Sequence, residues 1–523
     1  MSGLPAVSHL PGPLAPALAP LRAPVAAETA PAEVPAGWTA RASRLLTVLF
    51  VLVALEALYT VPKLTWDLAV GSRAGIGITL GLAAAAVTAA LLWTVRLRLA
   101  AWLQAASGRL TAIPHRRWLA LVIAAGIVPR LAWALLFPAP FTSDGLAYYE
   151  LAARMANGLS YQTRGGEWAE WPPGYPFLLL AHFRLLGVGP WVVDVANLLL
   201  FAGSILAVHA FARRFGEATA RLATLLLALW PDLIASTGTA TKELVVILLL
   251  PVLLLLYLRA GEARGARAVG LRLAAGAVFG YTILTQPALM LLGGVFVAYE
   301  LLVRTPVARA VGRLALLGAG TLLVVLPWTA RNYRVLHVPV LVSTNGGDVF
   351  YRSNNPLATG GWIEDGERPL RGYDELTKNR LGYRWGRAWI REHPARFLSL
   401  ALAKQALFLG DDAVGVFDTL KRGLGIGGLP YALLKLGTNA YWWGIWALVL
   451  AACFVHAATS WHRRAEVVLF LLVILYFWTI DSIFEGGARH HLPLAGLLAI
   501  LAASLAETIP RLPGRPGRRP DAR

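Results

Sequence analysis

The residues best suited to chemistry lie in an acidic, aromatic segment between positions 141 and 176. It contains the carboxylates Asp144 and Glu170 and the aromatic side chain Tyr148. A carboxylate can accept hydrogen bonds from sugar hydroxyls or take a proton from an attacking hydroxyl, and aromatic rings stack on sugar rings. We interpret the segment as a candidate sugar-binding site, with Asp144 as its first acid and Glu170 as its second. Another interpretation stays open, because Ser143 or Asp144 also stands where a helix N-cap is expected.

A phosphate-bearing substrate would need arginine or lysine side chains to hold its oxygens. The basic residues placed for this role are Lys242, Arg331, Arg334 and Arg489. Arg489 precedes His490 and His491, and adjacent helix residues point in different directions. The two histidines are therefore a poor pair of metal ligands, and a hydrogen-bonding role is expected for them. We expect neither a metal nor another cofactor.

A second polar segment, from 343 to 362, is dense in asparagine and glycine. Turns account for most of this composition, and no lysine follows its G-G-D to make a phosphate loop. Its side chains are also candidates for lining a sugar or acceptor pocket. These candidates are Asn345, Asp348, Tyr351, Asn354, Asn355 and Trp362.

The composition sets the environment in which this chemistry would occur. Of the 523 residues, 57% are hydrophobic and only 15% are charged, which excludes a soluble enzyme, a disordered protein and a fibre. The net charge of +19 comes from arginines at the ends of apolar segments. This pattern indicates cytoplasmic loops of a membrane protein rather than a nucleic-acid-binding surface. Cys453 is the single cysteine, so no intrachain disulfide can form.

Apolar runs of about 20 residues predict an all-α, polytopic membrane protein with about twelve spanning helices. The expected spans are 44–61, 74–95, 118–138, 191–212, 217–235, 242–259, 268–285, 287–303, 311–328, 432–456, 464–480 and 488–507. We call the arginine-rich segments between the spans the basic links. If all of these links lie on the cytoplasmic side, residues 173–188 and 396–410 must be interfacial helices rather than spans. It also leaves two long non-cytoplasmic loops, 139–190 and 329–431. Inside a span, Arg130 is expected to be functional or paired with an acid such as Glu56.

The expected organisation has four parts. They are an Ala/Pro-rich disordered cytoplasmic tail (1–40), two additional transmembrane helices (41–114), a membrane catalytic domain (115–508) and a basic cytoplasmic tail (509–523).

Several motifs in fixed order resemble the glycosyltransferase-C superfamily, closest to its protein O-mannosyltransferase and aminoarabinose transferase branch. The motifs are S-D-G-x-x-Y-Y-x-x-A at 143–152, N-G at 157–158, E-W-P-P-G-Y-P at 170–176, A-R-R-F-G at 212–216, L-W-P-D-L at 229–233, T-K-E at 241–243, P-W-T-A-R-N-Y at 327–333 and A-R-H-H-L-P-L at 488–494. The resemblance covers about residues 115–505. It implies that Asp144 is a general base or an acceptor-orienting acid, and that Glu170 and Glu243 match two further acids of the family.

The sequence departs from this family at two positions. Asp194 and Trp171 stand where related enzymes have a basic residue that helps to hold phosphate. Phosphate binding must therefore come from other residues, and the identity of the donor stays open.

The function expected is transfer of a sugar from a polyprenyl-phosphate donor to a hydroxyl of a lipid, glycan or protein acceptor. The reaction would take place on the outer face of the cytoplasmic membrane, in contact with the bilayer and without nucleic acid. Two other classes remain open: a transporter or flippase for a lipid-linked glycan, and a non-catalytic scaffold of the cell envelope.

Overall fold

The computed structural model describes residues 38–70, 74–363, 366, 368–457 and 464–507, and this part of the chain is helical with no β-strand. The all-α fold predicted from the sequence is confirmed. The predicted terminal tails lie outside the described residues, except for the last three positions of the first.

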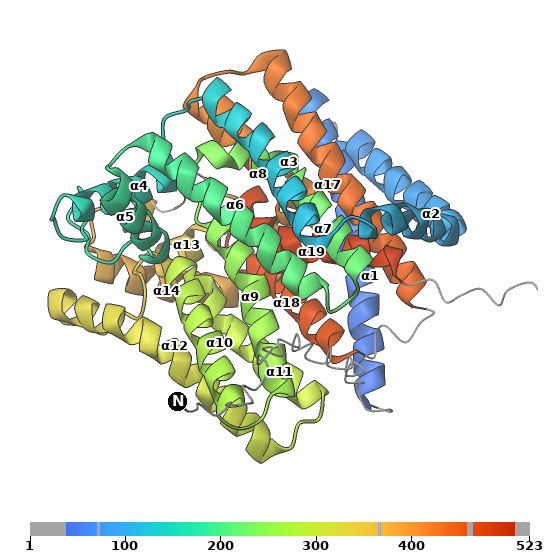
Figure 1. Cartoon of the computed structure of the whole chain (residues 1–523). Coiled ribbons are helices and arrows are strands. Elements are labelled where there is room, and N and C mark those ends of the chain that lie inside the picture. The colour runs from blue at the N-terminus through green and yellow to red at the C-terminus, as the bar shows by residue number, and fades with distance from the viewer. Residues whose placement is uncertain (1–37, 71–73, 364–365, 367, 458–463, 508–523) are drawn as a thin grey trace, which may run out of the picture.

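Among the residues that the structure describes, ten helices are long and apolar enough to cross a membrane, so the chain is a multi-pass membrane protein. They pack into one bundle (Figure 1). These helices are α1 (Trp38–Val70), α2 (Ala74–Thr111), α3 (His115–Leu136), α6 (Pro190–Ala212), α9 (Glu243–Glu262), α10 (Gly265–Thr285), α12 (Val307–Leu336), α17 (Gly428–His456), α18 (Ala465–Ile483) and the continuous run η6 (Ala488–Leu494), α19 (Ala495–Ala503) and η7 (Ser504–Ala506).

The other two expected spans are present in modified form. Helix α7 (Glu217–Ala228) and the pair α8 (Pro231–Ala235) and η1 (Ser236–Gly238) form a broken span, bent by 52°. The break falls at Pro231, because proline has no N–H for the helical ladder and its ring collides with the preceding turn. The segment 287–303 forms η2 (Pro287–Leu292) and α11 (Gly293–Leu302), an apolar stretch shorter than a full span.

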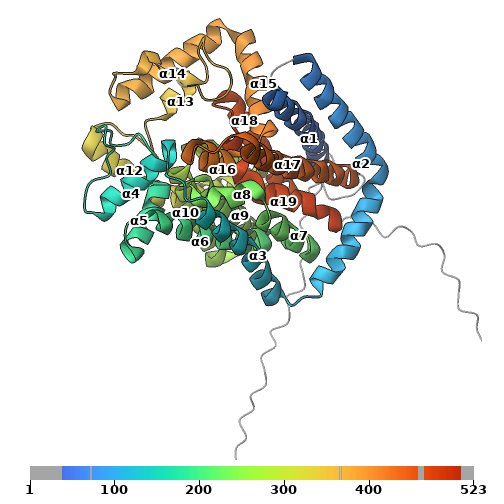
Figure 2. The same ribbon diagram turned by 90° about the horizontal axis from the view of Figure 1, so that it is seen from above.

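Shorter helices fill the two predicted loops. The first loop forms α4 (Ser143–Ala156) and α5 (Gly174–Leu186), and the second forms α13 (Gly346–Arg352), η3 (Arg368–Leu370), α14 (Glu375–Glu392), α15 (Pro394–Gly410), α16 (Val414–Val416) and the π-helical turn η4 (Phe417–Gly423). Seen from above, α4, α5, α13 and α14 lie toward the opposite side of the molecule from α2 (Figure 2). Neither α5 nor α15 is among the helices of spanning length.

Close backbone approach fixes the packing of α10 against α12. A Cβ atom added to Gly276 would lie 2.2 Å from the carbonyl oxygen of Leu317, and one added to Gly320 would lie 2.2 Å from that of Leu273. Such contact requires glycine, as in other membrane helix pairs that pack through small residues. The hydroxyl of Thr321 donates a hydrogen bond across this contact to the carbonyl of Gly276, at 3.1 Å.

Two expectations about local structure were wrong. Helix α2 continues to Thr111 instead of ending near 95, because the basic link that follows is rich in good helix formers such as alanine, leucine and arginine. Arg130 does not pair with Glu56. Its guanidinium donates to the carbonyls of Gly126 and Ala228 and stacks on a phenylalanine ring, whereas the Glu56 carboxylate accepts from Trp478.

Candidate active site

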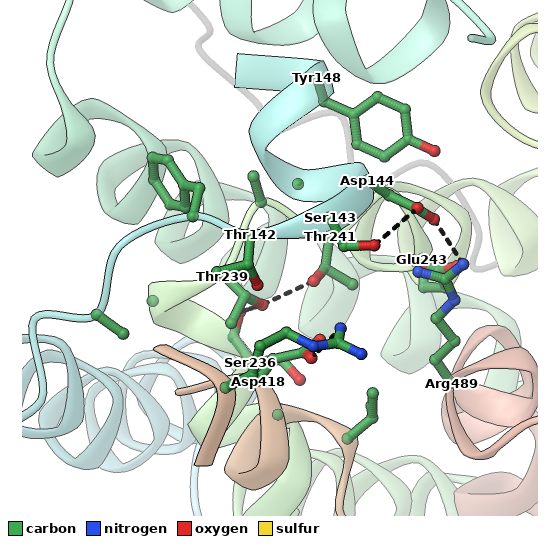
Figure 3. Close-up of a pocket in the computed structure, with 18 of the residues that line it drawn as sticks. Thr142, Ser143, Asp144, Tyr148, Ser236, Thr239, Thr241, Glu243, Asp418 and Arg489 are labelled. Carbon is green, nitrogen blue, oxygen red and sulfur yellow. Dashed lines mark hydrogen bonds and ion pairs between the residues drawn. The ribbon is translucent and has the colours of Figure 1, made fainter. Parts of the chain in front are cut away.

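A pocket of about 590 Å³, including its open mouth, lies where five parts of the chain meet (Figure 3). Its walls come from the loop before α4, the first turns of α4, the broken span that leads into α9, the α16–η4 segment and the first turn of η6. Pro231 matters here, because the break it causes turns Ser236 and Gly238 toward the pocket instead of continuing the helix.

Asp144 and Arg489 form an ion pair across this pocket. Arg489 Nη2 lies 2.5 Å from Asp144 Oδ2, and the two side chains are 34% and 18% exposed. The Ser143 hydroxyl donates to the other carboxylate oxygen at 3.3 Å. The pair therefore faces the cavity and remains within reach of a bound molecule.

Asp144 is not the cap of α4. The N-cap is Thr142, and no side-chain capping bond is present at this end, so the expected cap at Ser143 or Asp144 was wrong. Ser143 has a φ of 51°, in the left-handed region that costs a non-glycine residue about 1–3 kcal/mol. Backbone strain of this kind concentrates at functional sites, and here it immediately precedes the carboxylate that faces the pocket.

The charge around Asp144 keeps it ionised. Burial raises its pKa, but the positive charges of Arg489 and Lys242 outweigh burial and lower the pKa to about 2. In the resting protein Asp144 is thus a stable carboxylate that accepts hydrogen bonds, and it is a weak base for as long as Arg489 remains paired with it.

Three more predicted residues surround this pair. Tyr148 and Glu243 line the pocket and are almost completely buried, and the Lys242 ammonium lies 5.8 Å from the centre of the Tyr148 ring. The Tyr148 hydroxyl has no hydrogen-bond partner among the described residues. Burial raises its pKa well above the usual range, so it stays protonated and can donate. We call Asp144, Tyr148, Lys242, Glu243 and Arg489 the pocket group.

Five other predicted residues do not line this pocket, and each of these five has a local partner. Glu170 pairs with Lys378 at 3.5 Å, Arg331 donates to the backbone carbonyls of Trp168 and Tyr161, and the Asn345 side chain accepts from Ser343. Asp348 lies 3.8 Å from Arg352, and the ring of Tyr351 contacts that of Trp385. We call Glu170, Arg331, Asn345, Asp348 and Tyr351 the loop group.

The sequence did not single out several polar residues of the pocket. Asp418 and Arg422 form an ion pair of 2.8 Å on η4, and both line the cavity with the hydroxyls of Ser236, Thr239 and Thr241. The i,i+4 spacing of Asp418 and Arg422 was the available signal, but it is common on helix surfaces. Burial raises the pKa of Asp418, and Arg422 and Arg489 oppose this shift.

Buried contacts on both sides of η6 hold Arg489 in place. The His490 ring lies 2.9 Å from Asp481, and Nε2 of His491 lies 3.0 Å from Asp412 while its ring stacks on Trp442. The expected hydrogen-bonding role of these two histidines agrees with this geometry, which anchors the residues directly after Arg489.

A group of possible metal ligands lies away from the pocket, where α3 and α7 begin and α6 ends. The ligand atoms of His115, His209 and Glu217 lie within 4.8 Å of one another. However, the Glu217 carboxylate already pairs with Arg213 at 3.2 Å and Arg221 at 2.7 Å. These positive charges oppose a cation, and we assign no metal to this group.

Comparison with known proteins gives a family match that begins at Glu170 and ends at Ala330. Residues 170–330 match the family model described as dolichyl-phosphate-mannose-protein mannosyltransferase. Over these residues, the match agrees with the resemblance to the protein O-mannosyltransferase branch. The matched region includes Lys242 and Glu243 of the pocket group, whereas Asp144 and Arg489 lie outside it.

Two solved structures are similar at low sequence identity. ArnT from Cupriavidus metallidurans bound to undecaprenyl phosphate is 18% identical with a TM-score of 0.40, over 75% of this chain and 78% of that one. The Archaeoglobus fulgidus oligosaccharyltransferase in complex with Zn and sulfate is 15% identical with a TM-score of 0.41, over 73% of this chain and 48% of that one. No curated protein sequence matches the chain significantly.

Proposed function

We propose that the protein is a membrane glycosyltransferase that moves a sugar from a polyprenyl-phosphate donor to a hydroxyl acceptor. The observation that carries this proposal is the Asp144–Arg489 pair, in which a carboxylate and a guanidinium lie side by side in one pocket of a membrane protein. The family match and the spanning helices support it. The donor is a lipid, so its phosphate would lie at the membrane boundary while its sugar enters the pocket.

The two charged groups would act in sequence. A donor phosphate competes with Asp144 for the Arg489 guanidinium, which has the planar geometry that suits phosphate oxygens. When Arg489 turns to the phosphate, Asp144 loses its strongest neutralising contact, and its pKa rises because burial remains. Donor binding would therefore make Asp144 a better base at the moment when a base is needed.

The transfer step is a single displacement. The acceptor oxygen forms a bond to the anomeric carbon while the bond from that carbon to the phosphate oxygen breaks, which inverts the configuration. Asp144 takes the hydroxyl proton, or orients the hydroxyl, and Arg489 holds the phosphate equally in the bound donor and in the departing polyprenyl phosphate. Tyr148 lines the pocket while its hydroxyl is buried, so its ring would form part of the wall against the sugar.

A transfer assay tests this proposal against the transporter alternative. The purified full chain, reconstituted in liposomes, is given a panel of labelled polyprenyl-phosphate sugars with hydroxyl acceptors. Loss of the sugar from the donor together with release of polyprenyl phosphate supports transfer. Movement of intact donor between leaflets without loss of sugar contradicts it, because a flippase makes no covalent change.

Cysteine labelling tests whether the pocket opens to the outer face of the cytoplasmic membrane. Leu159 and Leu357 are 53% and 61% exposed, and both lie in the predicted outer loops. Leu159→Cys and Leu357→Cys should react with an impermeant thiol reagent on intact cells, in a Cys453→Ala background. Arg264→Cys, in a basic link, should not react. The opposite labelling pattern would place the pocket on the cytoplasmic side.

A further inference from the structure

One face of α14 carries four exposed arginines in a row. Arg380, Arg384, Arg387 and Arg391 follow the spacing i, i+4, i+7 and i+11, and all four are exposed. At 3.6 residues per turn and 1.5 Å per residue, they fall within an arc of about 60° along about 16 Å of helix. We call this set the arginine stripe.

The stripe has no acidic partner in the described part of the chain. No carboxylate there lies within ion-pair distance of any of the four side chains, and the one hydrogen bond they make is from Arg387 Nε to the Tyr383 carbonyl. The nearby acid Glu375 is engaged elsewhere, because its carboxylate accepts the backbone N–H groups of Trp168 and Ala169. Within the described residues, no acid compensates these four positive charges.

Packing of the opposite face fixes the direction of the stripe. Gly382 and Gly386 are buried against α13, where a Cβ on Gly382 would lie 2.1 Å from the Gly347 carbonyl. Trp389 is also buried and packs with Leu400 of α15. The helix cannot rotate without losing these contacts, so the arginines are held outward.

Helix α15 connects the arginine stripe to the end of a spanning helix. Helix α15 starts at Pro394, directly after α14, and exposes Leu398 and Leu402 at 64% and 65%. Two residues later, Lys404 donates to the carbonyl of Ile483, the last residue of the spanning helix α18. An exposed apolar patch thus lies between the stripe and the end of a spanning helix, as expected of a segment in contact with the edge of a bilayer.

We propose that the arginine stripe binds the phosphate headgroups of anionic phospholipids in the membrane leaflet on the pocket side. Arginine presents a planar fork that matches phosphate oxygens, and all four positions of the stripe are arginine rather than lysine. In the topology proposed above, the stripe lies on the non-cytoplasmic side, where positive residues are normally depleted. The neighbouring apolar patch favours a lipid surface over a soluble polyanion. This proposal does not depend on the chemistry of the pocket.

The test measures lipid binding to the purified full chain in neutral detergent micelles. Native mass spectrometry compares retention of phosphatidylglycerol with that of phosphatidylcholine for wild type and for the variant R380Q/R384Q/R387Q/R391Q. Because each arginine near an anionic surface strengthens binding by about fivefold, the variant should bind phosphatidylglycerol at least tenfold more weakly. Phosphatidylcholine retention should not change.

Two further variants keep the outcome interpretable. R380K/R384K/R387K/R391K keeps the charge and the fold, and it should retain most of the preference for phosphatidylglycerol. R259Q/R264Q/R267Q/R309Q removes four exposed arginines that are spread over two basic links, so it should weaken binding of phosphatidylglycerol less than the stripe variant does. Equal loss in the stripe variant and this control, or binding of soluble dextran sulfate without binding of phosphatidylglycerol, would overturn the proposal.

Discussion

The pocket group and the loop group contain the same kinds of residue, but they differ in what their charges face. In the pocket group, Asp144 and Arg489 meet across a cavity from helices distant in the sequence, and both stay partly exposed to it. In the loop group, Arg331 is occupied by two backbone carbonyls and Glu170 by a neighbouring lysine. A charged residue is thus a candidate for chemistry when its partner can be exchanged for a substrate. When its partner belongs to the folded chain itself, it is a candidate for stability.

The largest effect is expected for Asp144→Asn. The variant keeps the shape of the side chain but cannot take a proton, and transfer should fall by about 10²–10⁴-fold. Steady-state transfer by the purified protein measures this. The matched control is Glu150→Gln on the same helix, whose carboxylate pairs with Arg164 and does not line the pocket. Full activity of Asp144→Asn would contradict the proposed mechanism but not the description of the fold.

Arg489→Ala should mainly weaken binding of the donor. Loss of a charge-assisted contact to phosphate weakens binding by about 10–100-fold, and an interaction made in the ground state appears in KM more than in kcat. Donor titrations measured at saturating acceptor separate the two constants. An unchanged donor KM in a normally inserted protein would exclude Arg489 from the phosphate site.

The same substitution should shift the acid limb of the pH profile. In wild type the pKa of Asp144 is lowered to about 2, below its usual value of about 3.9. The ionised form therefore stabilises the fold at neutral pH, and this contribution is lost as the pH falls through about 2. Without Arg489, burial raises the pKa, so kcat/KM of Arg489→Ala should begin to fall at a higher pH than in wild type. An identical acid limb in both proteins would show that Arg489 does not control the pKa of Asp144.

Arg331→Gln should affect stability rather than chemistry. Its guanidinium holds the carbonyls of Trp168 and Tyr161, and loss of these bonds should cost about 2 kcal/mol. A lower melting temperature with a nearly unchanged donor KM is expected. A strong rise in the donor KM without loss of stability would instead indicate that Arg331 binds the substrate.

The smallest effect is expected for Glu170→Gln. Its pair with Lys378 is partly exposed, and such pairs contribute only about 0–1 kcal/mol. Transfer should change by less than about threefold in the assay used for Asp144→Asn. A loss comparable to that of Asp144→Asn would instead support the second catalytic acid predicted from the sequence.

The sequence predicted the spans well because the thickness of a bilayer imposes the length of each apolar run. Even the broken span at Pro231 was located as one apolar segment. Pairing of side chains was harder to predict. Glu150 lies four residues before Arg154, a spacing that favours an ion pair on one helix face, but its carboxylate pairs with Arg164. The Arg489 partner of Asp144 and the pocket position of Asp418 likewise depend on tertiary packing, which local spacing does not encode.

The separation of Asp144 and Arg489 in the chain has a consequence for synthesis. Arg489 lies 345 positions after Asp144, so at about 5–20 residues per second the ribosome adds it about 17–70 s later. During that interval the carboxylate lacks its strongest counter-charge, and the wall formed by η6 does not yet exist. The Asp144–Arg489 pair can therefore form only after the last of the described spanning helices has been made, and we expect a chain that stops before residue 489 to lack transfer activity.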